Sequence, residues 1–110
     1  NLVGVVDYNG QQIDGTVDSV LSLGDLKAKW LSFGWDVVEV DGNDYEALKT
    51  VLLGAKNNAN REKPLCILMR TIMGKGVDFM ENNHKWHGSP PNKEQFESAM
   101  AQLPSSLSDF

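Results

Sequence analysis

The sequence predicts an α/β fold, in which parallel strands are joined by helices. Three apolar runs, at 2–6, 35–40 and 65–72, have the length and composition of buried strands. Between them, 23–34 and 45–57 carry apolar residues at three- and four-residue spacing, which is typical of amphipathic helices. This order of strands and helices calls for parallel pairing with right-handed crossovers.

The composition of the 110-residue chain narrows the class of protein. It is 41% hydrophobic with a net charge of −5, and its charges are interspersed. Without a basic stripe to neutralise phosphates, we expect no nucleic-acid partner. No apolar run reaches the roughly 18 residues of a membrane-spanning helix, so we expect no membrane partner. The single cysteine, Cys66, lies in an apolar run and indicates a core residue in a reducing cytoplasm.

The first strand ends at a loop, 7–17, that is rich in oxygen-bearing side chains and glycine. Asp7 and Asn9 offer oxygen ligands, and Gly10 permits a sharp turn. Oxygen ligands from a short loop suit a hard cation such as Mg2+ or Ca2+. The Asn9–Gly10 step equally fits the turn of a β-hairpin, so the residues alone leave both interpretations open. An EF-hand does not fit, because its obligatory glycine would fall at Gln12.

The middle of the chain has recognisable helix and strand ends. The helix over 23–34 stops at Gly34, and the strand over 35–40 follows it. Asp44 is suited to cap the helix over 45–57. The apolar stripe of that helix consists of Leu48, Val51, Leu52 and Ala55.

The last part of the chain is less regular. A polar connection over 57–64 leads to the third strand, which is apolar on both faces, as in a covered parallel sheet. A long irregular segment, 73–91, precedes a helix over 92–103. Asn92 is its expected N-cap, with Gln95 in the position that a capping box uses.

Three strands make a thin sheet for an independent domain. The first strand also has no helix before it. Residues 1–103 are therefore interpreted as the C-terminal half of a doubly wound, mostly parallel domain. Residues 104–110 are expected to form a C-terminal tail that is frayed or packed against a partner.

Residues 7–15, with the sequence DYNGQQIDG, resemble the second half of the thiamine-diphosphate motif of transketolases. In that family the motif opens with Gly-Asp-Gly, which this sequence does not contain, and closes at an Asn-Gly step. The resemblance implies that Asn9 and the backbone carbonyl of Gln11 are ligands of Mg2+, with the turn made at Gly10. It also implies that Ile13 lies beside the thiazolium ring of the cofactor.

The resemblance extends along segments 33–44 and 63–76. Within the second of these, Gly74-Lys75-Gly76 is not a phosphate-binding P-loop. Met69 stands where the first glycine of that motif would fall, and no Ser or Thr follows Lys75. A turn at the end of a strand is the favoured interpretation.

Both histidines, His84 and His87, lie in segment 79–91. Two histidines without a cysteine or a further histidine are too few for a transition-metal site. The residues alone leave two other interpretations. Trp86 and His87 anchor the loop by packing, or one imidazole binds a phosphate or transfers a proton.

The resemblance distinguishes between these interpretations. The run 80–83 followed by Trp86-His87-Gly88 is similar to small split transketolase subunits, which carry only the pyrophosphate-binding domain. It implies that His87 contacts the cofactor diphosphate and faces the substrate channel as a catalytic residue. His84 is left as a surface residue.

The implied reaction is transfer of a two-carbon ketol unit from a ketose (phosphate) to an aldose (phosphate). The Gly-Asp-Gly aspartate and the glutamate that activates the aminopyrimidine are not in this sequence, and neither Asp14 nor Glu81 is assigned their roles. We therefore expect the chain to be inactive without the missing half-domain and a pyrimidine-binding domain or subunit, in a dimer or heterotetramer. Two alternatives stay open. One is a non-catalytic α/β subunit on an active partner. The other is a different thiamine-diphosphate enzyme, such as a deoxyxylulose-phosphate synthase or a dehydrogenase subunit.

Overall fold

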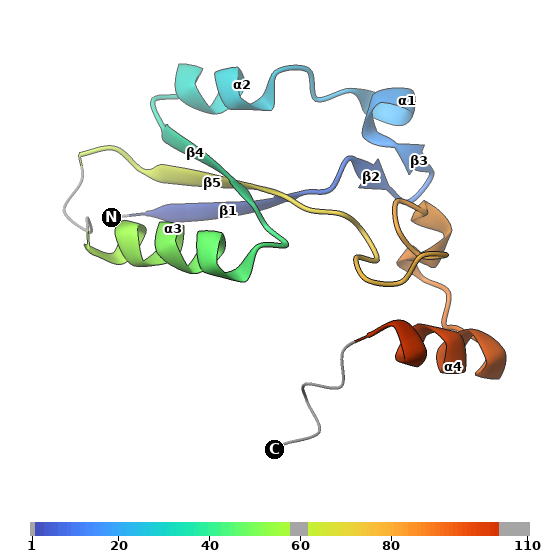
Figure 1. Cartoon of the computed structure of the whole chain (residues 1–110). Coiled ribbons are helices and arrows are strands. Elements are labelled where there is room, and N and C mark those ends of the chain that lie inside the picture. Colours follow the sequence, from blue (N-terminus) through green and yellow to red (C-terminus); the bar gives the residue numbers. More distant parts are fainter. Residues whose placement is uncertain (1, 58–61, 104–110) are drawn as a thin grey trace.

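A computed structural model describes residues 2–57 and 62–103. Its centre is a parallel sheet in the order β1-β5-β4 (Figure 1). β1 spans Val3–Tyr8, β4 spans Asp36–Asp41 and β5 spans Leu65–Arg70. The predicted parallel α/β architecture is confirmed, and the last strand along the chain lies in the middle of the sheet.

Two helices cover the two faces of this sheet, α2 (Leu26–Ser32) on one side and α3 (Tyr45–Asn57) on the other (Figure 1). Cys66 and Leu68 of β5 are fully buried, and burial raises the pKa of the Cys66 thiol, as expected of a core cysteine. Alternate residues of β5 face α3. The core on that side consists of Val40, Ala55, Leu65 and Ile67, with Val38, Ala47, Leu48, Val51 and Met69 packed against it.

The helix ends follow from side-chain caps. The carboxylate of Asp44 accepts a hydrogen bond from the amide of Ala47 at 3.0 Å, so α3 begins as predicted. The carboxylate of Asp25 accepts from the amide of Ala28 at 2.8 Å, so α2 begins later than the predicted residue 23. Gly34, with φ +82°, terminates that helix region as expected.

The final helix, α4 (Lys93–Gln102), has the predicted capping box between Asn92 and Gln95. Gln102 connects this helix to the preceding loop. Its side chain accepts from the amide of Asp78 at 2.8 Å and donates to the Asp78 carboxylate at 2.9 Å. The predicted tail over 104–110 and the centre of the polar connection, 58–61, lie outside the described residues.

The stretch after β1, predicted to be a loop, contains regular elements. β2 (Gln11–Gln12) and β3 (Gly15–Thr16) pair as a small antiparallel hairpin, and the short helix α1 (Val17–Leu21) follows. The hairpin alternative is therefore correct in kind, but its turn lies at residues 13–14 and not at the Asn-Gly step.

The Asn-Gly step instead redirects the chain from β1 into β2. The side-chain oxygen of Asn9 accepts a hydrogen bond from the amide of Gln11 at 2.9 Å, which forms an Asx turn. Gly10 has φ +71°, a conformation that glycine adopts readily. The chain therefore has both features, an Asx turn at Asn9 and, directly after it, the hairpin formed by β2 and β3.

β1 is an edge strand, because among the described residues β5 is the one strand in the sheet that pairs with it. It continues two residues beyond its predicted end, because Asp7 and Tyr8 pair with Met69 and Arg70 of β5. No other strand in the described part of the chain pairs with its outer edge.

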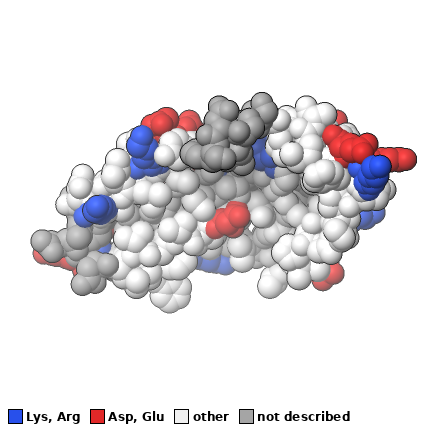
Figure 2. All heavy atoms as spheres, turned by 90° about the horizontal axis from the view of Figure 1, so that it is seen from below, with Lys and Arg blue, Asp and Glu red and all other residues white. Residues whose placement is uncertain are grey.

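Figure 2 shows the α3 side of the molecule, where most surface atoms belong to uncharged residues. The exposed side chains of β1 on that side include Val3 (38%) and Val5 (50%).

Among the described residues, no helix is both long and apolar enough to cross a bilayer.

Candidate functional site

A cavity of about 300 Å³ gathers most of the predicted site residues. It lies where the chain leaves β1, and it receives side chains from both ends of the sequence. Its lining consists of Asn9, Gln11, Gln12, Ile13, Met73 and His87. The predicted site residues were Asn9, Gly10, Gln11, Ile13 and His87, and of these only Gly10 is outside the lining. The carbonyl oxygen of Gly10 accepts a hydrogen bond from the amide of Val17 at 2.9 Å.

The oxygen donors in the cavity suit one side of a hard-cation site. The Asn9 side-chain oxygen accepts one hydrogen bond, from Gln11, and a carboxamide oxygen has a second lone pair available. In residues 2–57 and 62–103, no cluster of three or more His, Cys, Asp or Glu side chains could hold a metal ion. Mg2+ takes few protein oxygens and fills its shell with water and phosphate. The donor set therefore fits a partial Mg2+ site.

Asp7, the other oxygen ligand considered from the sequence, is not in the cavity lining. Its carboxylate accepts a hydrogen bond from the hydroxyl of Thr71, the residue that follows β5. This contact joins the carboxyl ends of β1 and β5. Asp7 thereby stabilises the sheet edge on which the cavity is built.

Two apolar side chains line the cavity beside these oxygens. Ile13 lies in the turn between β2 and β3 and is 66% exposed, which leaves a large apolar surface for contact with a ligand. Met73 lies just beyond β5, and Gln12 is in β2. Sequence reasoning missed Met73 and Gln12. For Met73 the missing information was the pairing of β5 with β1, because it brings residues after β5 to the end of β1.

His87 reaches the cavity from a short 3₁₀ helix, η1 (His84–His87). The indole N–H of Trp86 donates to the carbonyl oxygen of Phe79 at 2.9 Å, and the centres of the Trp86 and Phe79 rings lie 5.4 Å apart. Trp86 thus anchors the loop, as the packing interpretation proposed for it, and His87 lines the cavity. Binding of a phosphate or transfer of a proton by an imidazole stays a prediction. His84, to which no role was assigned, is partly exposed and lies outside the cavity lining.

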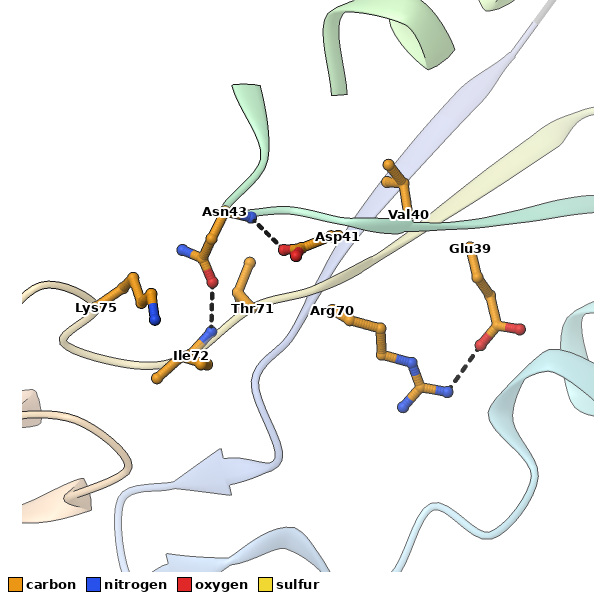
Figure 3. Close-up of a pocket in the computed structure, with 8 residues that line it drawn as sticks. All are labelled: Glu39, Val40, Asp41, Asn43, Arg70, Thr71, Ile72 and Lys75. Atoms are coloured by element: carbon orange, nitrogen blue, oxygen red, sulfur yellow. Dashed lines mark hydrogen bonds and ion pairs between the residues drawn. The ribbon is translucent and has the colours of Figure 1, made fainter. Parts of the chain in front are cut away.

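A larger groove, of about 500 Å³, lies at the carboxyl ends of β4 and β5 (Figure 3). Its charged groups have partners within the protein: Arg70 pairs with Glu39 at 2.7 Å, and Lys75 pairs with Glu81 at 3.6 Å. The side-chain oxygen of Asn43 accepts from the amide of Ile72 at 2.8 Å. Because none of the predicted residues lines this groove, we place the candidate site in the smaller cavity.

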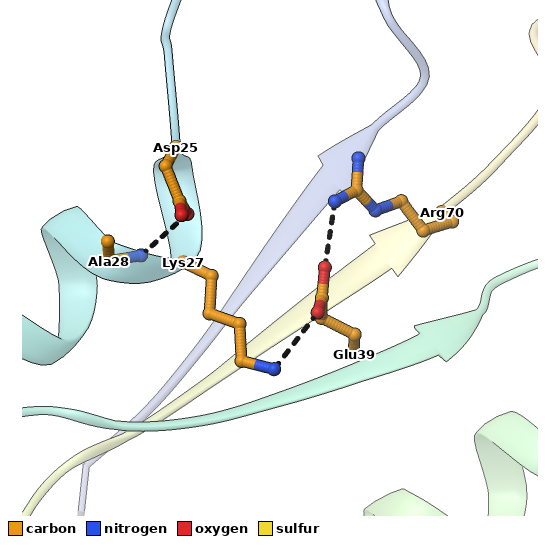
Figure 4. A network of polar contacts seen from close by, with 5 residues as sticks. All are labelled: Asp25, Lys27, Ala28, Glu39 and Arg70. Carbon is orange, nitrogen blue, oxygen red and sulfur yellow. Dashed lines mark hydrogen bonds and ion pairs between the residues drawn. The ribbon is translucent and has the colours of Figure 1, made fainter.

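Glu39 is the centre of a polar network beside that groove (Figure 4). Its carboxylate contacts Arg70 at 2.7 Å and Lys27 of α2 at 3.1 Å. The Arg70 guanidinium, followed by the Lys27 ammonium, lowers the pKa of Glu39 from its usual 4.5, and Glu39 raises the pKa of Arg70. Arg70 also lies 4.3 Å from the centre of the Tyr8 ring. The network connects α2, β4, β5 and β1 at the edge of the sheet that carries the site.

The fold defines part of a doubly wound α/β domain, and its candidate ligand site is the cavity at the carboxyl edge of the sheet. Residues 1–106 match the family described as transketolase, thiamine diphosphate binding domain. The chain belongs to this family, and the family recognised from segments 7–15 and 80–88 is confirmed.

Two curated relatives are named as subunits of transketolases. An apulose-4-phosphate transketolase subunit from Phocaeicola vulgatus is 37% identical over 103 residues, which are 94% of this chain and 36% of the relative. The 6-deoxy-6-sulfo-D-fructose transketolase subunit SqwG from Clostridium sp. is 35% identical over 103 residues, 94% of this chain and 37% of that relative. The chain thus spans little more than a third of the length of these relatives.

Solved transketolases share the fold. The enzyme from Campylobacter jejuni superimposes with a TM-score of 0.81 at 30% identity, over 93% of this chain and 16% of that one. The Pichia stipitis enzyme in complex with sedoheptulose-7-phosphate gives a TM-score of 0.78 at 28% identity, over 92% and 15%. The sheet and its flanking helices therefore correspond to part of a transketolase.

Proposed function

We propose that this chain is part of a transketolase-type transferase. The enzyme transfers a two-carbon ketol unit from a ketose (phosphate) to an aldose (phosphate) with thiamine diphosphate and Mg2+. The chain matches the family of transketolase thiamine diphosphate binding domains, and within that family one observation supports the proposal most strongly. Asn9, Gln11, Ile13 and His87, from opposite ends of the sequence, line the same cavity.

Asn9 and Gln11 hold the cation in this proposal. The side-chain oxygen of Asn9 and the backbone carbonyl oxygen of Gln11 would bind Mg2+, or Ca2+ in its place. The Asx turn between the two residues presets their spacing. A Mg2+ ion that also binds phosphate takes only a few oxygens from the protein, and these two would be part of that share.

Ile13 and His87 act on the organic part of the cofactor and on the substrate. When bound, thiamine diphosphate supplies the electron sink for breaking the carbon–carbon bond next to the ketose carbonyl. The exposed side chain of Ile13 packs beside the thiazolium ring and excludes water there. His87 donates a hydrogen bond to the diphosphate and moves a proton at a substrate oxygen, which is chemistry suited to imidazole near neutral pH.

The chain works within a larger assembly in this proposal. The outer edge of β1 has no partner strand among the described residues, and Val3 and Val5 leave apolar surface beside it. A further half-domain carrying Gly-Asp-Gly covers this edge and completes the Mg2+ site. A pyrimidine-binding domain or subunit supplies the activating glutamate, in a dimer or heterotetramer. The buried free thiol of Cys66 favours a reducing cytoplasm.

Ketol transfer by the complete assembly tests the proposal. The donors to assay are ketose phosphates together with the two sugars in the names of the relatives, apulose-4-phosphate and 6-deoxy-6-sulfo-D-fructose. We expect Asn9→Ala and His87→Ala each to lower kcat/KM by about 100-fold or more, as is typical for lost catalytic groups. His84→Ala is the matched control, because that histidine lies outside the cavity lining.

The outcomes separate the three candidate functions. Wild-type transfer that depends on Asn9 and His87, and not on His84, supports the transketolase role. Full activity in all three variants indicates a non-catalytic subunit on an active partner. Thiamine-diphosphate-dependent turnover of a 2-oxo acid without ketol transfer indicates another enzyme of the thiamine-diphosphate class.

A further inference from the structure

The His87 side chain depends on its neighbours for its position. It is exposed and lines the cavity. Among the described residues, no hydrogen bond or ion pair holds its imidazole ring. The backbone of η1 therefore sets the direction of its Cα–Cβ bond, from which the ring extends.

Trp86, the residue before it, fixes that backbone. The Trp86 amide donates to the carbonyl oxygen of Asn83 at 3.1 Å, and its indole N–H donates to the carbonyl oxygen of Phe79 at 2.9 Å. The ring contact with Phe79 adds a third constraint. Successive side chains of a 3₁₀ helix lie about 120° apart around its axis. An indole held against Phe79 thus sets the direction of the next Cα–Cβ bond, that of His87.

The Phe79 carbonyl oxygen, which accepts the indole hydrogen bond of Trp86, lies in a segment that is itself held in place. The amide of Phe79 donates to the carboxylate of Asp78 at 2.7 Å, and Asp78 is bonded to Gln102 of α4. The indole therefore binds to a part of the loop that α4 holds in place.

We propose that Trp86 is a positioning residue, which holds the His87 imidazole toward the cavity through the indole hydrogen bond to Phe79. This inference rests on the proposed function, in which His87 contacts the cofactor diphosphate. Loss of the hydrogen bond frees the turn of η1, and the imidazole then samples directions away from the cavity. The consequence is weaker binding of the cofactor with no change in any group that touches it.

The test compares two Trp→Phe substitutions in the complete assembly. Trp86→Phe keeps an aromatic ring against Phe79 and removes the donor. Trp30→Phe is the matched control, because the indole nitrogen of Trp30 is buried without a hydrogen-bond partner among the described residues. Calorimetric titration with thiamine diphosphate and Mg2+ gives the Kd. We expect Trp86→Phe to raise it about fivefold, as for one lost neutral hydrogen bond, and Trp30→Phe to leave it unchanged.

A double-mutant cycle with His87→Ala shows whether Trp86 acts through that histidine. The proposal predicts that Trp86→Phe has no further effect on the Kd once His87 is alanine. An equal loss in both backgrounds, or a Trp86→Phe variant that binds like wild type, overturns it. Failure of the wild-type assembly to bind thiamine diphosphate refutes the proposed function first, and this role of Trp86 with it.

Discussion

The backbone amide of Asn82 donates to the carbonyl oxygen of Met73 at 3.0 Å, and this hydrogen bond closes the loop that follows β5. Asn82 has φ +55°, and no other non-glycine residue in the described part of the chain has a positive φ. Met73 lines the cavity, so the bond connects the geometry of the loop to the site. The left-handed conformation of one asparagine is thus part of what positions the cavity wall.

Asn82 is expected to tolerate glycine and not valine. Asn82→Gly keeps the conformation at little cost, whereas a β-branched side chain is strained there. We predict that Asn82→Val lowers the free energy of unfolding by about 1–2 kcal/mol relative to Asn82→Gly. Urea denaturation measures the difference. Equal stability of the two variants would show that this backbone conformation is not needed.

A second prediction concerns Gly74, where backbone conformation and close packing act together. Gly74 has φ +73°, and an added Cβ would lie 2.6 Å from the carbonyl oxygen of Met80. Gly34 has a similar φ of +82°, but an added Cβ there meets no atom within 4 Å. We expect Gly34→Ala to cost about 1 kcal/mol and Gly74→Ala about 2–4 kcal/mol, since only the second adds a clash. Thermal unfolding of both variants gives the comparison, and equal losses would argue against the clash.

Much of the fold follows from local signals that act over a few residues. The caps at Asp44 and Asn92 set the starts of α3 and α4, because a side-chain oxygen satisfies an amide of the first turn wherever the helix packs. The three strands were likewise predicted from apolar runs. Their order in the sheet was not predicted, since the pairing of β5 with both β1 and β4 depends on contacts between distant parts of the chain.

The site shows the same division between local and distant information. Asn9, Gln11, Ile13 and His87 were named from motifs, and the structure places them at one cavity. The hairpin formed by β2 and β3 was misplaced, because the Asn-Gly turn signal does not reveal that the Asn9 side chain bonds forward to Gln11. Met73 carries no motif of its own, and only the sheet order brings it to the site.

The capping box of α4 gives a prediction about helix stability. Asn92 accepts from the amide of Gln95, and the Gln95 side chain accepts from the amide of Asn92, both at 2.9 Å. We predict that Asn92→Ala lowers the free energy of unfolding by about 1 kcal/mol, while Asn92→Asp keeps most of it. Urea denaturation of the two variants distinguishes them. An alanine variant as stable as the aspartate variant would contradict a role for the cap.

The polar network around Glu39 predicts a pH-dependent stability. Arg70 and Lys27 lower the pKa of Glu39 below its usual 4.5, so the folded state favours the carboxylate. The network therefore stabilises the fold above this value, and the contribution is lost as the pH falls through the lower, folded-state pKa. We expect Glu39→Gln to melt at a lower temperature than wild type at neutral pH.

The pH dependence of that difference is the test. The two melting temperatures should converge as the pH falls from 4.5 through the lower, folded-state pKa of Glu39, because only below that pKa is wild-type Glu39 protonated in both states. Lys49→Gln is a suitable control, since its contact with Glu46 is an exposed i,i+3 pair of 3.5 Å. A difference between Glu39→Gln and wild type that does not change with pH would show that the carboxylate charge is not involved.

In the proposed function, Asn9 holds a cation that binds the cofactor. The most direct test is Mg2+-dependent binding of thiamine diphosphate by the complete assembly. Calorimetric titration of wild type, Asn9→Ala and Asp14→Asn compares a cavity residue with an acidic neighbour outside the lining. We predict that chelating Mg2+ abolishes binding, that Asn9→Ala weakens it at least about tenfold, and that Asp14→Asn leaves it unchanged. Binding by Asn9→Ala that equals wild type in affinity and in Mg2+ dependence would contradict the account.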